Sequence, residues 1–139
     1  MKKHSKIILL ALILSSFALI YYFNKESGPQ LSLNDVIKSF SDNNIKLSAD
    51  PQNGLKIKGQ SPHNYLVNDQ PYNYISIYVF ESTRERKKAK KEYDRVTSNY
   101  DKPPYQVYEA KNILIILEAG DRSNEVYKNV FDIMKKLEI

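Results

Sequence analysis

Side chains that commonly do chemistry in enzymes are scarce in this sequence. It has two histidines and no cysteine, so thiol catalysis and cysteine-based metal sites are excluded. His4 lies in a short basic N-terminal stretch, which leaves His63 as the one candidate base further along. No G-x-S-x-G, H-E-x-x-H, P-loop or G-x-G-x-x-G motif is present. The sequence therefore predicts no catalytic, cofactor or metal site. The alternative is an envelope-acting hydrolase whose site combines His63 with carboxylates distant in sequence.

Basic side chains form the first candidate binding site. A helix predicted at 82–100 has a narrow apolar line, and at about 100° per residue five cations fall on the opposite side. They are Arg84, Lys87, Lys88, Lys91 and Arg95. Such a face suits anionic lipid head groups or anionic wall polymers, where each cation contributes on the order of 1 kcal/mol. The simpler interpretation is a solvated helix face.

Tyrosines form the second candidate. The chain has 11 Tyr and no Trp, and the predicted strand at 72–80 places Tyr72, Tyr74 and Tyr78 on one side. A tyrosine ring offers apolar area with a hydroxyl that tolerates water, which suits a glycan, a peptide or a partner protein. The alternative is that helices cover this side of the sheet and that the rings belong to the core.

Two predicted strands should form the framework on which the basic and tyrosine side chains are held. The strand at 72–80 has no charge on either side, and the stretch at 113–117 is an unbroken apolar run. Continuous apolar runs are typical of strands that are covered on both faces. We therefore expect both strands in the middle of the sheet, with other elements above and below.

The remaining elements define the fold class. Ser32 and Ser82, each followed three residues later by an acid, predict N-capped helices, and a third helix is expected at about 123–137. Alternating apolar residues at 45–47 and 55–57 flank an Asn-Gly pair, which predicts a hairpin. The order of elements predicts an α+β domain, with a mostly antiparallel sheet of about five to six strands and three packing helices.

An uncharged segment at 7–23 precedes this domain. As a helix it spans roughly 26 Å, enough for a hydrocarbon core. Three lysines come before it: Lys2, Lys3 and Lys6. A secretory signal peptide cut after Ala18 is one interpretation, and a retained transmembrane signal-anchor is the other. The poor cleavage context favours the anchor, and secretion after cleavage is the alternative.

Charge then sets the organisation of the chain. The positive-inside rule places 1–6 in the cytoplasm as a short tail, 7–23 in the membrane, 24–31 as a polar linker, and 32–139 outside as the α+β domain. The chain after the anchor contains 18 basic and all 16 acidic residues, since only three of the 21 Lys and Arg residues precede the anchor. This near balance argues against a nucleic-acid partner.

Several short stretches of the domain carry a resemblance to known proteins: Pro62-His63-Asn64-Tyr65, Ile77-Tyr78-Val79-Phe80-Glu81-Ser82, Glu85 with Arg86, and Lys111-Asn112-Ile113-Leu114-Ile115. With these stretches, the domain resembles small membrane-anchored envelope proteins of Gram-positive bacilli that have no assigned activity. The resemblance covers most of 32–139. It implies a membrane-tethered, extracytoplasmic placement and carries over no functional residue.

We therefore expect a non-enzymatic binding or modulating component of the bacterial cell envelope. Its predicted partners are the lipid bilayer through 7–23 and an anionic lipid, a wall polymer or another envelope protein. No cofactor is expected.

Overall fold

The computed structural model describes residues 13–17, 28–99, 105–120 and 124–139. Residues 13–17 are helical, and most of the predicted anchor and linker lies outside the described ranges. Within those ranges, no helix has the length and apolar character needed to cross a membrane. The domain elements are α2 (Leu33–Asp42), β1 (Leu47–Ala49), β2 (His63–Val67), β3 (Asn73–Val79), α3 (Thr83–Thr97), β4 (Tyr105–Ala110), β5 (Ile113–Ala119) and α4 (Asn124–Glu138).

The five strands form one sheet in the order β1-β2-β3-β5-β4, and every neighbouring pair is antiparallel. The longest pairing joins β3 to β5, from Asn73 opposite Ala119 to Val79 opposite Ile113. These are the two strands expected in the interior of the sheet. The predicted α+β class with an antiparallel sheet is thus confirmed.

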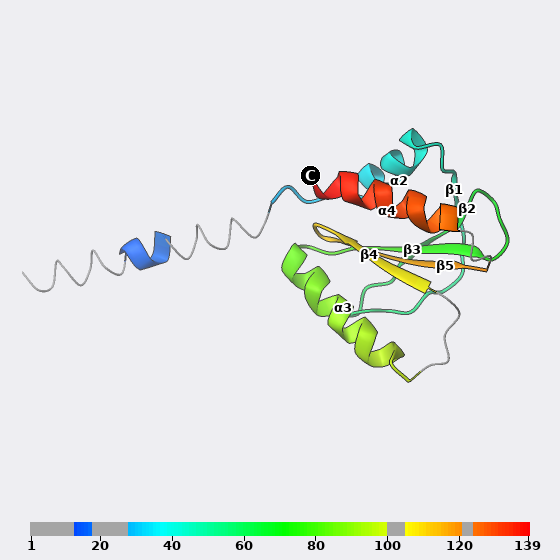
Figure 1. Ribbon diagram of the computed structural model, residues 1–139. Helices are drawn as coiled ribbons and strands as arrows, with labels where there is room; N and C mark the ends of the chain where they lie inside the picture. Colours follow the sequence, from blue (N-terminus) through cyan, green and yellow to red (C-terminus); the bar gives the residue numbers. More distant parts are fainter. Residues whose placement is uncertain (1–12, 18–27, 100–104, 121–123) are drawn as a thin grey trace, which may run out of the picture.

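Helices cover both faces of the sheet, as Figure 1 shows: α2 and α4 lie together on one face, and α3 lies on the other. Along β5 the side chains alternate between the two sides. Ile113, Ile115 and Leu117 belong to the core under α2 and α4, whereas Leu114 and Ile116 belong to the core under α3. This double coverage explains why the apolar run of β5 shows no alternation with polar residues.

The predicted N-caps hold the ends of the first two domain helices. Ser32 accepts a hydrogen bond from the Asp35 amide, and the Asp35 carboxylate accepts one from the Ser32 amide, which completes a capping box. Hydrogen bonds from Ser32 keep the pKa of Asp35 below its usual value. At α3, the Ser82 hydroxyl accepts a hydrogen bond from the Glu85 amide over 3.2 Å.

The hairpin predicted between 45–47 and 55–57 is wrong. β1 pairs instead with β2, and Ile57 makes only an isolated bridge to Gln60. Neither residue of the Asn-Gly pair has a positive φ. Gly54 serves a close approach, because a Cβ there would lie 2.4 Å from Pro62 Cγ. The segment at 50–61 covers the sheet beside α3 instead: Ile57 is buried in that core, while Leu55 is 44% exposed.

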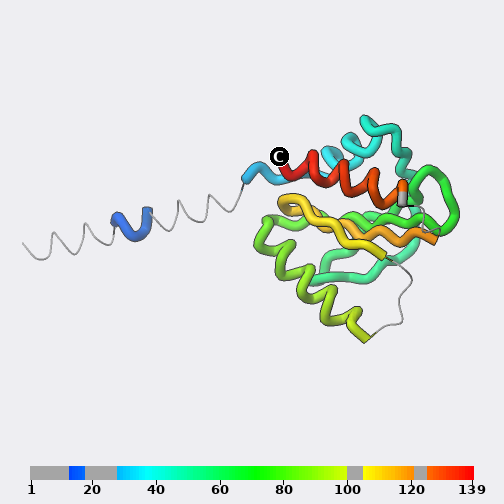
Figure 2. The backbone as a smooth tube through the Cα atoms, in the orientation of Figure 1, coloured from blue at the N-terminus to red at the C-terminus, as the bar shows by residue number. Residues whose placement is uncertain are grey.

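Asn112, in the turn between β4 and β5, holds the point where the chain enters the domain. Its Oδ1 accepts a hydrogen bond from the Leu31 amide (2.7 Å), and its Nδ2 donates to the Leu31 carbonyl (2.9 Å). The same Nδ2 donates to the Phe80 carbonyl (2.8 Å). Asn112 is buried, so these bonds are shielded from water. Figure 2 shows the entering chain, the β4–β5 turn and the C-terminal end of α4 at the same end of the domain.

Candidate functional site

The outer side of α3 carries all five cations that the sequence placed there. The helix turns its buried side chains, among them Ala89 and Tyr93, toward the sheet. Arg84, Lys87, Lys88, Lys91 and Arg95 are all exposed. We call these five residues the basic face of α3.

Most of these cations are not neutralised. Lys88 forms an ion pair with Glu85 (2.7 Å), and this hydrogen bond is the main reason why the pKa of Glu85 lies below its usual value. Within the described ranges, the other four members of the face make no ion pair. Their charge is therefore available to an external anion.

A hollow of about 340 Å³ lies on this face, lined by Thr83, Arg84, Lys87, Lys88 and Lys91. Lysine and arginine are hydrogen-bond donors without acceptor capacity, and both stay charged at neutral pH. Among the described residues that line the hollow, Thr83 supplies a hydroxyl and the other four supply cations. This lining suits the binding of an anionic group.

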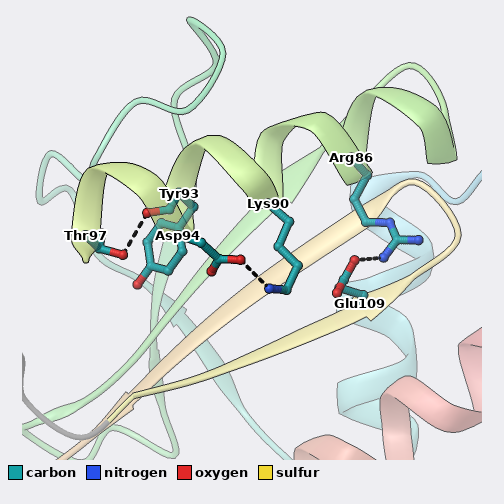
Figure 3. Close-up of polar contacts among 6 residues, drawn as sticks. All are labelled: Arg86, Lys90, Tyr93, Asp94, Thr97 and Glu109. Carbon is teal, nitrogen blue, oxygen red and sulfur yellow. Dashed lines mark hydrogen bonds and ion pairs between the residues drawn. The ribbon is translucent and has the colours of Figure 1, made fainter.

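α3 is tied to the sheet beneath by a partly buried ion pair, which the sequence analysis missed (Figure 3). The Arg86 guanidinium donates to Glu109 Oε2 on β4, and the two side chains are 9% and 30% exposed. Arg86 Nε is buried without a hydrogen-bond partner in the described structure. The sequence does contain a sign of this buried charge. Arg86 lies three and seven residues before Ala89 and Tyr93, so it falls on the same buried side of the helix.

Further contacts fix the orientation of α3. Tyr93 packs edge-on against Tyr105 with ring centroids 5.8 Å apart, and burial raises the pKa of Tyr93. Glu92 accepts a hydrogen bond from the Lys58 amide (3.0 Å), which joins the helix to the segment at 50–61. The basic face is thus presented by a helix held at several points.

The candidate tyrosine face is not continuous. Tyr72 is 69% exposed but precedes β3 and has a φ of 84°, and Tyr74 is half-buried. Tyr78 is only 1% exposed, and its hydroxyl donates to the Leu55 carbonyl over 2.6 Å. Burial raises its pKa to about 12. Including Tyr78 in a partner-binding face is therefore a mistake, because α3 and the segment at 50–61 cover this side of the sheet.

His63 is exposed at the start of β2, opposite Ile77. Its side chain makes no hydrogen bond to a carboxylate in the described parts of the chain, and it does not line the hollow on α3. Two other hollows lie between α2 and β1 and between β4 and α4, and His63 lines neither. Among the described residues, no group of three or more His, Asp or Glu side chains is placed to hold a metal ion.

Comparison with protein-family models gives no match, and neither the curated proteins nor the solved structures contain a match to this chain.

Proposed function

We propose that this protein is a membrane-anchored, extracytoplasmic and non-enzymatic component of a bacterial cell envelope, and that it binds anionic groups through the basic face of α3. The observation that carries the proposal is the set of four cations beside the hollow on that helix that have no ion-pair partner in the part of the chain that the structure describes.

The spacing of the cations on the basic face, the ion-paired Lys88 included, favours a binding role. Arg84 with Lys88, Lys87 with Lys91, and Lys91 with Arg95 are pairs at i, i+4. Like charges at this spacing destabilise a helix by about 0.2–0.5 kcal/mol per pair. An anion bound between such side chains removes this repulsion, so the arrangement gains stability when the ligand is present.

The placement outside the membrane is supported by the sequence. The uncharged segment at 7–23 follows three lysines, which favours an anchor with its N-terminus in the cytoplasm. The resemblance to envelope proteins of Gram-positive bacilli points to the same compartment.

Placement is tested in intact cells that express the full chain. We expect the protein to sediment with membranes, to resist extraction at high salt, and to be cleaved by external protease after removal of the wall. Mature protein in the medium, starting near Leu19, would establish the secreted alternative and overturn the anchor. Protection from external protease would overturn the orientation.

Anion binding is tested with the full chain in phosphatidylcholine nanodiscs and soluble polyphosphate as the probe. We expect the quadruple variant R84Q/K87Q/K91Q/R95Q to lose at least about tenfold in affinity, since each cation near an anionic array contributes on the order of 1 kcal/mol. The loss should shrink as salt is added.

A matched control removes four other exposed lysines, in the variant K56Q/K58Q/K128Q/K135Q. Both variants change the net charge equally. An equal loss of affinity in the two would show that net charge alone attracts the probe, and would overturn the assignment to α3.

A further inference from the structure

The chain enters the domain beside the start of α3. Asn112 bonds to both Leu31 and the Phe80 carbonyl, and the Phe80 amide donates back to the Asn112 carbonyl over 3.0 Å. Ser82, the N-cap of α3, follows only two residues after Phe80. The point of entry and the first turn of α3 are therefore fixed to one another, and both lie at the same end of the domain in Figure 1.

The linker sets how far this end can lie from the membrane. Seven residues, 24–30, separate the predicted anchor from Leu31, and a fully extended chain spans at most about 3.5 Å per residue. Leu31 is thus confined to within roughly 25–28 Å of the end of the anchor. α3 itself is about 22 Å long, so its N-terminal half is the part held nearest to the bilayer.

The charges at this end are mostly positive once paired groups are removed. Glu85 is bound by Lys88, and Glu109 is bound by Arg86. Among the described residues, two acids at this end have no ion pair: Glu81 before α3 and Glu138 at the end of α4. Arg84 and Lys87 make no ion pair with any described residue, and both line the hollow.

We propose that Arg84 and Lys87 bind the anionic lipid head groups of the same bilayer that holds the chain, in an orientation set by the attachment of Leu31 to Asn112. This inference rests on the proposed function, because it needs the anchor. A lipid is favoured over a wall polymer because the short linker keeps the head groups at a high effective concentration beside the hollow.

The test compares full-length protein in phosphatidylcholine nanodiscs with protein in discs that also contain phosphatidylglycerol. The chain has no cysteine, so a fluorophore can be placed at one site, either near the start of α3 (Glu81→Cys) or just beyond its end (Asn99→Cys). Quenching by a spin-labelled head group reports the distance to the membrane. With phosphatidylglycerol we expect quenching to rise at position 81 by a factor of about two or more and to rise less at position 99.

Two matched charge variants decide whether the hollow is responsible. R84Q/K87Q should abolish the rise at position 81, and K56Q/K128Q, which loses the same charge elsewhere, should keep it. Equal quenching with and without phosphatidylglycerol, or a rise that survives R84Q/K87Q, would overturn the inference.

A linker variant tests the tether without touching the folded domain. Inserting about twenty Gly and Ser residues after Gly28 lowers the effective concentration of head groups about eightfold. We expect the rise at position 81 to weaken accordingly, and an unchanged rise would contradict the role of the short linker.

These outcomes separate this inference from the proposed function. If polyphosphate still binds through the basic face but phosphatidylglycerol has no effect on quenching, the lipid inference fails and the anion-binding function stands. If the chain does not remain with the discs on flotation, the anchor fails and the lipid inference fails with it.

Discussion

The two faces of the sheet are built in different ways. Under α2 and α4 the core is mostly aliphatic, with Ile75, Ile77, Ile115 and Leu117 fully buried at its centre. Under α3 the core is rich in aromatic rings, and Tyr78 stacks on Phe80 with ring centroids 6.2 Å apart and planes 6° from parallel.

The helices that cover these faces differ in the same way. α2 and α4 contribute apolar residues such as Phe40, Val130 and Ile133 to the core. The buried residues of α3 include two polar ones, Arg86 and Thr97. A helix that contacts the sheet through only a narrow row of side chains can carry charged residues on most of its surface. The candidate binding surface is thus on the element whose sequence is least committed to apolar packing.

Ile115→Ala and Leu114→Ala compare the faces directly, because these neighbours on β5 point into opposite cores. We expect Ile115→Ala to cost about 4 kcal/mol and Leu114→Ala about 3 kcal/mol. The cost is smaller for Leu114→Ala because its face is covered by one helix and the irregular segment at 50–61. That segment can move to fill part of the cavity that the substitution leaves. Guanidinium unfolding of the full chain in detergent measures both, and the reverse order would contradict the comparison.

Glu109→Ala tests the ion pair under α3. It leaves the Arg86 guanidinium buried without its partner, and we expect a cost of about 3 kcal/mol. The double variant R86M/E109L, which replaces both charges by apolar groups, should be within about 1 kcal/mol of the parent protein. If the double variant is as unstable as Glu109→Ala, the loss of stability comes from altered packing rather than from an unpaired buried charge.

High pH should weaken the packing on both faces of the sheet, and one tyrosine on each face, Tyr78 and Tyr108, tests this. Burial raises the pKa of Tyr78 and of Tyr108 to about 12 from the ordinary value of 10. Because the folded state favours the neutral hydroxyl, this contribution is complete below pH 10 and is lost as the pH rises from 10 to 12. Each tyrosine accounts for on the order of 2 kcal/mol.

The measurement is the free energy of unfolding across this range for the parent protein, Tyr78→Phe and Tyr108→Phe. Each variant should flatten the decline by a similar amount. A decline unaffected by both substitutions would assign it to other groups.

R84Q/K87Q should have the smallest effect on stability. Both side chains are exposed and neither has an ion-pair partner among the described residues, and the variant removes the repulsion with Lys88 and Lys91, so we expect a gain of less than about 1 kcal/mol. The same unfolding experiment measures it. A loss above about 1 kcal/mol would show that the cations stabilise α3, and would weaken their assignment to binding.

Periodicity was sufficient to predict the centre of the fold. The unbroken apolar run at 113–117 predicted a strand covered on both sides, and the Ser32 and Ser82 caps predicted where two helices begin. The outer position of the five cations followed from the same helical geometry. These features depend on residues close together in the sequence.

The features that were missed depend on contacts between distant residues. Leu55 and Ile57 have the spacing of a strand, yet they belong to an irregular segment in which Leu55 is exposed and Ile57 is buried. Arg86 and Glu109 meet across 23 positions. Tyr78 was one candidate for an exposed face until the segment at 50–61 was found to cover it. Two apolar residues at a spacing of two do not distinguish a strand from a covering loop.

The attachment of Leu31 to Asn112 also determines how the domain bears mechanical force. A pull on the N-terminal chain reaches the two hydrogen bonds at Leu31 first and passes through Asn112 into the β4–β5 turn and Phe80. α2 begins only at Leu33, beyond this point, so it carries no tension while these bonds hold. A pull on the N-terminal chain is therefore resisted by the strands β3 and β5 before α2 is unwound.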